Sequence, residues 1–92
     1  MSDAPSVGPG REERRRVRAA FLDLLAERSP GKTFCPSEVA RRVFPAGEWR
    51  GRMGVVREVG HGMVEEGILV ARQRGQVVAP GTARGPIRYG RA

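Results

Sequence analysis

Apolar residues recur at helical spacing across residues 11–28. They fall at i, i+4, i+7 and i+8, so they share one face of a helix, and they are Val17, Phe21, Leu24 and Leu25. Glu12 and Glu13 near the start of this segment, and Arg28 at its end, suit the helix dipole. The sequence Ser29-Pro30-Gly31 ends the pattern. We therefore predict an amphipathic first helix over residues 11–28.

Two further helices are predicted after the first one. Pro36 suits the first position of a helix, where its missing N–H is no loss, and Cys35 and Glu38 have the spacing of a capping box. This short helix should span residues 36–44. A longer helix follows over residues 48–66. Its apolar face is expected to consist of Trp49, Met53, Val56, Gly60, Met63 and Val64.

A second, mostly cationic stripe runs along the third helix. Its members fall at i, i+4, i+7 and i+11, and they are Arg50, Gly54, Arg57 and His61. A glycine inside a helix costs about 0.5–1 kcal/mol relative to alanine. We expect Gly60, on the apolar face, to allow another helix to approach closely. Gly54 either lets a partner approach the backbone or marks a loosely held helix.

Two short β-compatible segments, residues 68–71 and 76–79, flank the dipeptide Arg74-Gly75. Glycine supplies the positive φ that a two-residue turn requires. The pattern predicts a hairpin, the wing, with side chains available for burial at Leu69, Ala71, Val77 and Val78. Residues 32–34 are expected to pair with this hairpin as a third strand and to turn Phe34 into the core.

Together these elements predict a winged helix-turn-helix, an α+β fold that is mostly α, with three helices and a small antiparallel β-hairpin wing. The winged-helix domain should span residues 11–80. Residues 1–10 contain proline and glycine without apolar periodicity, so we expect a disordered lead. Residues 81–92 should form a basic, irregular C-terminal tail whose Ile87 and Tyr89 pack back on the core.

Composition limits the kinds of partner and the cellular location that we expect for the protein. The chain has 92 residues and a net charge of +7, which favours a polyanionic partner. Its 17 basic residues include a single lysine, Lys32, and this arginine bias is also what GC-rich codons produce, so the charge is either functional or compositional. One cysteine excludes an internal disulfide, and this fits a cytoplasmic protein. No apolar run is long enough to span a membrane.

Several motifs occur in an order that resembles one known family. They are Phe21-Leu22-Asp23-Leu24-Leu25, Pro30-Gly31-Lys32-Thr33-Phe34-Cys35-Pro36-Ser37-Glu38-Val39-Ala40-Arg41, Trp49-Arg50, Met53, Val56-Arg57, Glu66-Gly67 and Ala83-Arg84-Gly85-Pro86-Ile87-Arg88. The sequence resembles a small bacterial family catalogued as domain-of-unknown-function family 3253, over nearly everything after Arg11. The resemblance implies a winged-helix-like fold, and it implies no activity.

Candidate chemistry is sparse. Cys35 and His61 form the only conceivable nucleophile–base pair, and the spacing offers no third group to orient the imidazole. One cysteine and one histidine cannot supply a four-ligand zinc site. The glycine-rich stretches lack the lysine and the strand–loop–helix context of a phosphate loop. We therefore expect a protein that is not an enzyme and that uses no metal or cofactor.

The function that we predict is binding of double-stranded DNA, as in a transcriptional regulator. The third helix would enter the major groove and the wing would contact the backbone or minor groove; the nucleic-acid-binding residues would be Arg50, Arg57, His61, Arg72 and Arg74. The alternative is a protein–protein interaction module, in which the cationic flank docks on an acidic protein and the helix glycines admit a partner helix. Trp49 is expected to anchor the core, with base stacking as the other interpretation.

Overall fold

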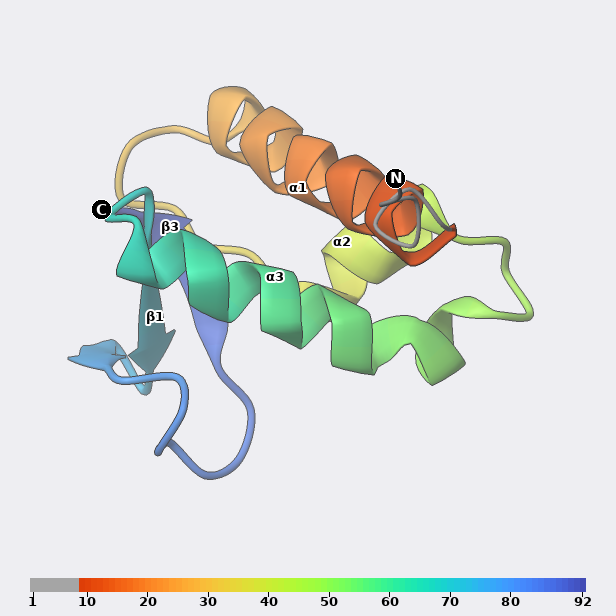
Figure 1. Ribbon diagram of the computed structural model, residues 1–92. Helices are drawn as coiled ribbons and strands as arrows, with labels where there is room; N and C mark the ends of the chain where they lie inside the picture. Colours follow the sequence, from red (N-terminus) through yellow and green to blue (C-terminus); the bar gives the residue numbers. More distant parts are fainter. Residues whose placement is uncertain (1–8) are drawn as a thin grey trace, which may run out of the picture.

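The structure is a computed structural model of the chain, and it describes residues 9–92. Its helical part consists of α1 (Pro9–Glu27), α2 (Pro36–Val43), the short 3-10 helix η2 (Trp49–Arg52) and α3 (Met53–Glu65). Three strands follow, β1 (Leu69–Gln73), β2 (Gln76–Val78) and β3 (Arg88–Arg91). Figure 1 shows α1 and α3 packed beside each other, with the sheet at the C-terminal end of α3. Three helices followed by a three-stranded antiparallel sheet confirm the predicted α+β fold, and they are consistent with a winged helix.

The helix boundaries differ from the predicted ones at two places. Helix α1 begins at Pro9, so the last two residues of the predicted lead are helical, and residues 1–8 of that lead lie outside the described residues. The predicted third helix begins as the 3-10 turn η2 and becomes α-helical only at Met53. Its end follows the prediction, because Gly67 adopts a φ of +82° just beyond it, the conformation in which glycine commonly ends a helix.

The predicted capping arrangement of α2 is present. The backbone N–H of Cys35 donates to the Glu38 carboxylate at 3.0 Å, and the N–H of Glu38 donates to the Cys35 carbonyl oxygen at 3.0 Å. Pro36 occupies the first helical position, as predicted. Glu38 also accepts a hydrogen bond from the Arg28 guanidinium. The start of α2 is therefore fixed both to its own backbone and to the end of α1.

The sheet has the strand order β2-β1-β3, and both pairings are antiparallel. The predicted hairpin is thus confirmed, with Gln73 paired to Gln76 across its turn. The third strand differs from the prediction, since it comes from the tail as β3 and not from residues 32–34. Phe34 makes only an isolated bridge, and its partner is Tyr89 of β3. Strand β3 therefore lies between Phe34 and β1, and the expectation of an irregular tail is wrong for residues 88–91.

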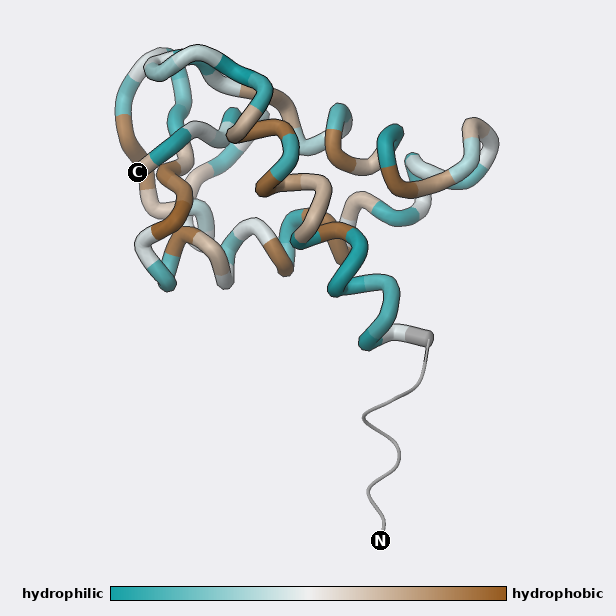
Figure 2. The backbone as a smooth tube through the Cα atoms, turned by 90° about the horizontal axis from the view of Figure 1, so that it is seen from above, coloured by the Kyte–Doolittle hydropathy of each residue, from teal (hydrophilic) through white to brown (hydrophobic). Residues whose placement is uncertain are grey.

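The core joins the three helices to the inner face of the sheet. At its centre Phe21, Phe34 and Tyr89 are fully buried, and the Phe21 and Tyr89 rings meet edge to face with centroids 5.2 Å apart. Figure 2 shows the matching pattern along the chain, in which hydrophobic positions recur through the helices and the first turns of α1 are hydrophilic. Two predicted core residues are less buried than expected. Trp49 packs against the core but is only partly buried, and Val77 on the edge strand β2 is 60% exposed.

Candidate nucleic-acid interface

Ion pairs hold α1 against the other helices. Arg14 pairs with Glu58 of α3 at 2.6 Å, and Arg18 pairs with Glu66 at 2.9 Å. Two further pairs join Glu13 to Arg52 of η2 at 3.3 Å and Glu27 to Arg42 of α2 at 2.6 Å. The Arg18 hydrogen bonds lower the pKa of Glu66, and those of Arg42 lower the pKa of Glu27. Most of the acidic residues of the domain thus form ion pairs on the side of α1.

A second group of arginines is left without carboxylate partners. Among residues 9–92, the arginines that form no ion pair and no hydrogen bond to protein are Arg41, Arg50, Arg57, Arg72, Arg74 and Arg84. They lie on α2, η2, α3, β1 and the segment beyond β1, whereas most of the paired arginines lie on or face α1. A guanidinium without an internal partner retains its five N–H donors for an external anion.

One wall of an open cleft is formed by the flank of α3 that carries Arg57 and His61. The cleft has a volume of about 540 Å³. It is also lined by the N-terminal end of α2, with Cys35 and Ser37, and by residues of the chain between Pro80 and Ile87. Arg57 and His61, which the sequence placed on one stripe of the helix, therefore come together on one surface. Arg57 is exposed and His61 is partly buried.

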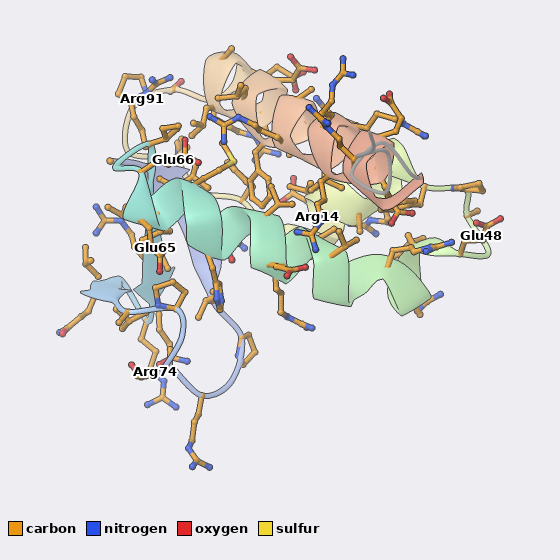
Figure 3. All side chains as sticks on the ribbon, in the orientation of Figure 1. Arg14, Glu48, Glu65, Glu66, Arg74 and Arg91 are labelled. Atoms are coloured by element: carbon orange, nitrogen blue, oxygen red, sulfur yellow. The ribbon has the colours of Figure 1, made fainter. Side chains whose placement is uncertain are left out.

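The segment between β1 and β3, residues 74–87, is called here the β1–β3 connection. It contains β2 and projects away from α1, below the sheet in Figure 1. Its first turn has positive φ at both central residues, 53° at Arg74 and 82° at Gly75, which is the geometry of a two-residue hairpin turn. Arg74 lies on this projecting part, as labelled in Figure 3.

A side chain of the sheet shapes the rest of the β1–β3 connection. The Gln73 amide nitrogen donates to the carbonyl oxygen of Arg84 and, at 3.3 Å, to that of Pro86. This brings Arg84 beside Arg74, and both line a hollow of about 390 Å³ together with Gly85 and Pro86. Because Gly85 and Pro86 also line the cleft of Arg57, the two depressions adjoin. Arg84 was not predicted as a site residue; only its place in a basic segment pointed to it.

The two remaining predicted residues lie elsewhere. Arg72 alternates along β1 with the buried Leu69 and Ala71, so it extends from the face of the sheet opposite the core. There it lies across from Arg88 in the strand register. Arg50 lies at the start of the third helix, where its guanidinium carbon is 4.5 Å from the centroid of the Trp49 ring. Arg57 and His61 therefore line one depression and Arg74 and Arg84 line the adjoining one, whereas Arg50 and Arg72 line neither.

Cys35 is held by the neighbouring strand. The Arg88 guanidinium donates to the Cys35 sulfur at 2.9 Å and to the Thr33 hydroxyl and carbonyl oxygens at 2.7 and 3.0 Å. These contacts attach residues 33–35 to β3. Cys35 and His61 both line the cleft, but within the described part of the chain no group of three or more His, Cys, Asp or Glu side chains gathers as a metal site would require.

The glycines of α3 fall into two kinds. A Cβ atom built on Gly60 would meet Tyr89 and Phe21, so packing explains this glycine; the neighbours are a strand residue as well as the expected helix. A Cβ built on Gly54 or Gly62 would meet nothing within 4 Å. Gly54 is exposed, one turn before Arg57. Internal packing therefore leaves Gly54 unexplained, and an external partner that approaches the helix backbone is one reason for a glycine there.

Comparison with known protein families gives a match over most of the chain. Residues 14–92 match the family described as "Protein of unknown function (DUF3253)". No curated protein matches the chain. Within residues 9–92, every helix is too short or too polar to cross a membrane.

Proposed function

The chain belongs to the DUF3253 family of proteins of unknown function, and we propose that it binds double-stranded DNA through α3 and the β1–β3 connection. The observation that carries the proposal is the partition of charge. Carboxylates pair with Arg14, Arg18, Arg42 and Arg52 around α1, whereas Arg57, Arg74 and Arg84 remain unpaired on two adjoining depressions. Binding to DNA depends mainly on cationic side chains that replace the counterions of phosphates.

The dimensions of the helix agree with this role. Helix α3 has 13 residues, and an α-helix with its side chains is about 10–12 Å in diameter. The major groove is about 12 Å wide and admits one α-helix. With α3 in the groove, Gly54 and Arg57 would face the base edges, and the projecting Arg74 and Arg84 would contact phosphates. The absence of a side chain at Gly54 would allow the backbone to approach the DNA closely.

The proposal describes a non-catalytic binding module without a cofactor. The Cys35 sulfur accepts a hydrogen bond from Arg88, and the Cys35 backbone is committed to the cap of α2. Both contacts give this residue a structural role at the junction of α2 and β3. His61 then serves as a partly buried neighbour of Arg57 on the wall of the cleft, close enough along the helix to contact the same phosphate backbone.

The experiment is an NMR and anisotropy titration with a short mixed-sequence DNA duplex. We expect chemical-shift changes at Gly54, Arg57, His61, Arg74 and Arg84, and an affinity that falls as salt rises. Arg57→Gln should reduce the slope of log affinity against log salt by about 1. The matched control is Arg15→Gln, which removes the same charge from an exposed pair with Glu12. Equal effects of the two variants, or an affinity insensitive to salt, would overturn the proposal.

Protein binding is the second candidate, and the open space above Gly54 and Gly62 favours it, because small residues let a partner helix pack closely. The partner would carry acidic residues opposite Arg57 and Arg74. The same titration separates the candidates. A chain that shows no shifts on α3 with any duplex does not bind DNA through α3, and these glycines then point to a helical, acidic protein.

A further inference from the structure

Two arginines stack on a single aromatic ring at the start of the third helix. The guanidinium carbon of Arg41, from α2, lies 5.4 Å from the centroid of the Trp49 ring, and that of Arg50 lies 4.5 Å from it. Both distances are in the range of cation–π contacts. Both arginines are exposed, and neither forms an ion pair within the described residues. The domain therefore presents two fixed positive charges around one tryptophan.

Stacking leaves the hydrogen-bonding capacity of a guanidinium intact. The ring contacts the flat face of the group, whereas its five N–H donors lie in the plane and point outward. A stacked arginine is also restricted in its rotamers before it meets an anion, so less conformational entropy is lost on binding. Arg41 and Arg50 thus have both properties of a phosphate contact, namely free planar donors and a fixed position.

A neighbouring arginine also stacks on an aromatic ring but does not keep a free charge. Arg52 stacks on Phe44 at 5.7 Å, but it also pairs with Glu13 at 3.3 Å. The charge of Arg52 is therefore neutralised inside the domain, and its ion pair is one of those that connect α1 to the other helices. The comparison separates two uses of arginine within one short helix, since Arg50 faces outward without a carboxylate and Arg52 faces α1.

We propose that Trp49, Arg41 and Arg50 form a second phosphate-binding site, the Trp49 patch, which contacts the DNA backbone at the N-terminal end of α3. The inference rests on the proposed function. It assigns Trp49 the role of a positioning residue, because its ring is partly buried and is approached by two guanidinium groups. The ring would orient the two arginines, and it would not stack on a base.

The arrangement of the elements supports this assignment. Figure 1 shows η2 at the N-terminal end of α3 and the sheet at its C-terminal end. The β1–β3 connection reaches back along α3, because Pro80 and Pro86 line the same cleft as Met53 and Arg57, whereas no residue of the Trp49 patch lines that cleft. The Trp49 patch is therefore a separate basic region at the start of the helix. A helix lying in the major groove has a phosphate backbone on each side. With α3 in the groove, the Trp49 patch and the arginines of the β1–β3 connection would each contact a backbone, and this would fix the orientation of α3.

The test uses the fact that Trp49 is the single tryptophan of the chain. Its fluorescence should change when the full chain binds a mixed-sequence duplex. Arg41→Gln should weaken binding about fivefold, the factor that corresponds to one hydrogen bond of ordinary net strength, and should reduce the salt slope by about 1. The matched control is Arg52→Gln, whose charge change is identical and whose guanidinium is already paired. This control should leave the salt slope unchanged.

A second variant tests the role of the ring itself. Trp49→Leu keeps both arginines and removes the cation–π contacts, so we expect a loss of affinity similar to that of Arg41→Gln, measured by anisotropy of labelled DNA. One outcome is duplex binding that depends on Arg57 while Trp49 fluorescence stays unchanged and Arg41→Gln and Arg52→Gln show the same affinity and salt slope. That result would overturn the Trp49 patch alone. Failure of the unaltered chain to bind any duplex would instead overturn the proposed function.

Discussion

The side chain of Tyr89 lies directly against Gly60. A Cβ atom placed on Gly60 would come within 2.6 Å of the Tyr89 hydroxyl oxygen and 3.0 Å of the Phe21 ring. This contact joins α3, α1 and β3 at the centre of the core. It explains a glycine in the middle of a helix, and it ties the position of α3 to the third strand.

Gly60→Ala should therefore destabilise the domain. The added methyl group would displace the Tyr89 and Phe21 rings from a closely packed core, and overpacking of this kind costs about 1–3 kcal/mol. Urea unfolding followed by circular dichroism measures the change in the free energy of unfolding. An alanine variant as stable as the unaltered chain would show that Tyr89 does not occupy this position.

Gly54→Ala is the matched comparison on the same helix, and it should have the opposite effect. A Cβ there meets nothing within 4 Å, so the helix should gain about 0.5–1 kcal/mol. If DNA approaches the backbone at Gly54, this more stable variant should bind a duplex more weakly. The free energy of unfolding and the duplex affinity are both measured for this variant. A variant that is more stable but binds the duplex as tightly as the unaltered chain would show that DNA does not approach the backbone at Gly54.

Alkaline pH should destabilise the domain through Tyr89. Its hydroxyl group is buried without a hydrogen-bond partner in the described chain, and burial raises the pKa to about 12, although the charge of Arg57 acts to lower it. The unfolded value is about 10. The stability linked to this group is thus complete below about pH 10 and is lost as the pH rises through about 12.

Tyr89→Phe should remove the part of the stability loss at alkaline pH that comes from Tyr89. It should also leave the neutral-pH stability unchanged or raise it by up to about 1 kcal/mol, because an unsatisfied hydroxyl is lost. Since Tyr89 is the single tyrosine, the ultraviolet absorbance of tyrosinate follows its ionisation directly. Titration of that absorbance near the ordinary pKa in the folded chain would contradict the burial of the hydroxyl group.

Acid should weaken the junction of α1 and α2 at Glu38. Partial burial acts to raise the pKa of Glu38, but the hydrogen bonds from the Cys35 amide and the Arg28 guanidinium outweigh it, and the pKa lies below its ordinary value. The stability that these bonds give is present above the unfolded pKa of about 4.3. It is lost as the pH falls through the lowered folded value.

Glu38→Gln should cost about 1 kcal/mol of stability at neutral pH, because a charged cap and its partner are lost. The difference from the unaltered chain should vanish in acid. Glu48→Gln is the control, since Glu48 lies exposed on the turn before η2 and forms no ion pair within residues 9–92 (Figure 3). Equal unfolding free energies for the two variants at neutral pH would rule out the cap.

Local patterns in the sequence were sufficient for the helices and the hairpin. The stripe of α1 repeats over several turns, and its members Val17, Phe21 and Leu24 are all buried. The turn at Arg74-Gly75 carries its own backbone requirement. Trp49 packs against the core as predicted, but it is only partly buried, because the helix begins as a 3-10 turn. With 3.0 residues per turn in that segment, the angular count based on an α-helix no longer describes which face Trp49 occupies.

The third strand and part of the site could not be predicted locally. Strand β3 reads Arg88-Tyr89-Gly90-Arg91, where a single apolar residue gives no alternation to detect. Its assignment depends on pairing with β1 and Phe34, which are distant in the sequence. Arg84 joins Arg74 only because the Gln73 amide binds the carbonyl oxygens of the connection. A single arginine in a glycine-rich stretch of sequence does not indicate such a contact.

The position of β3 between Phe34 and β1 determines how the protein would respond to proteolysis. Arg91 donates to the Leu25 carbonyl oxygen across 66 positions of the sequence, and Tyr89 fills the centre from the same strand. One cut between residues 79 and 87 would sever this strand from the rest of the chain. Neither fragment would retain a complete aromatic centre, so a single nick in an exposed loop should lead to degradation of the whole domain.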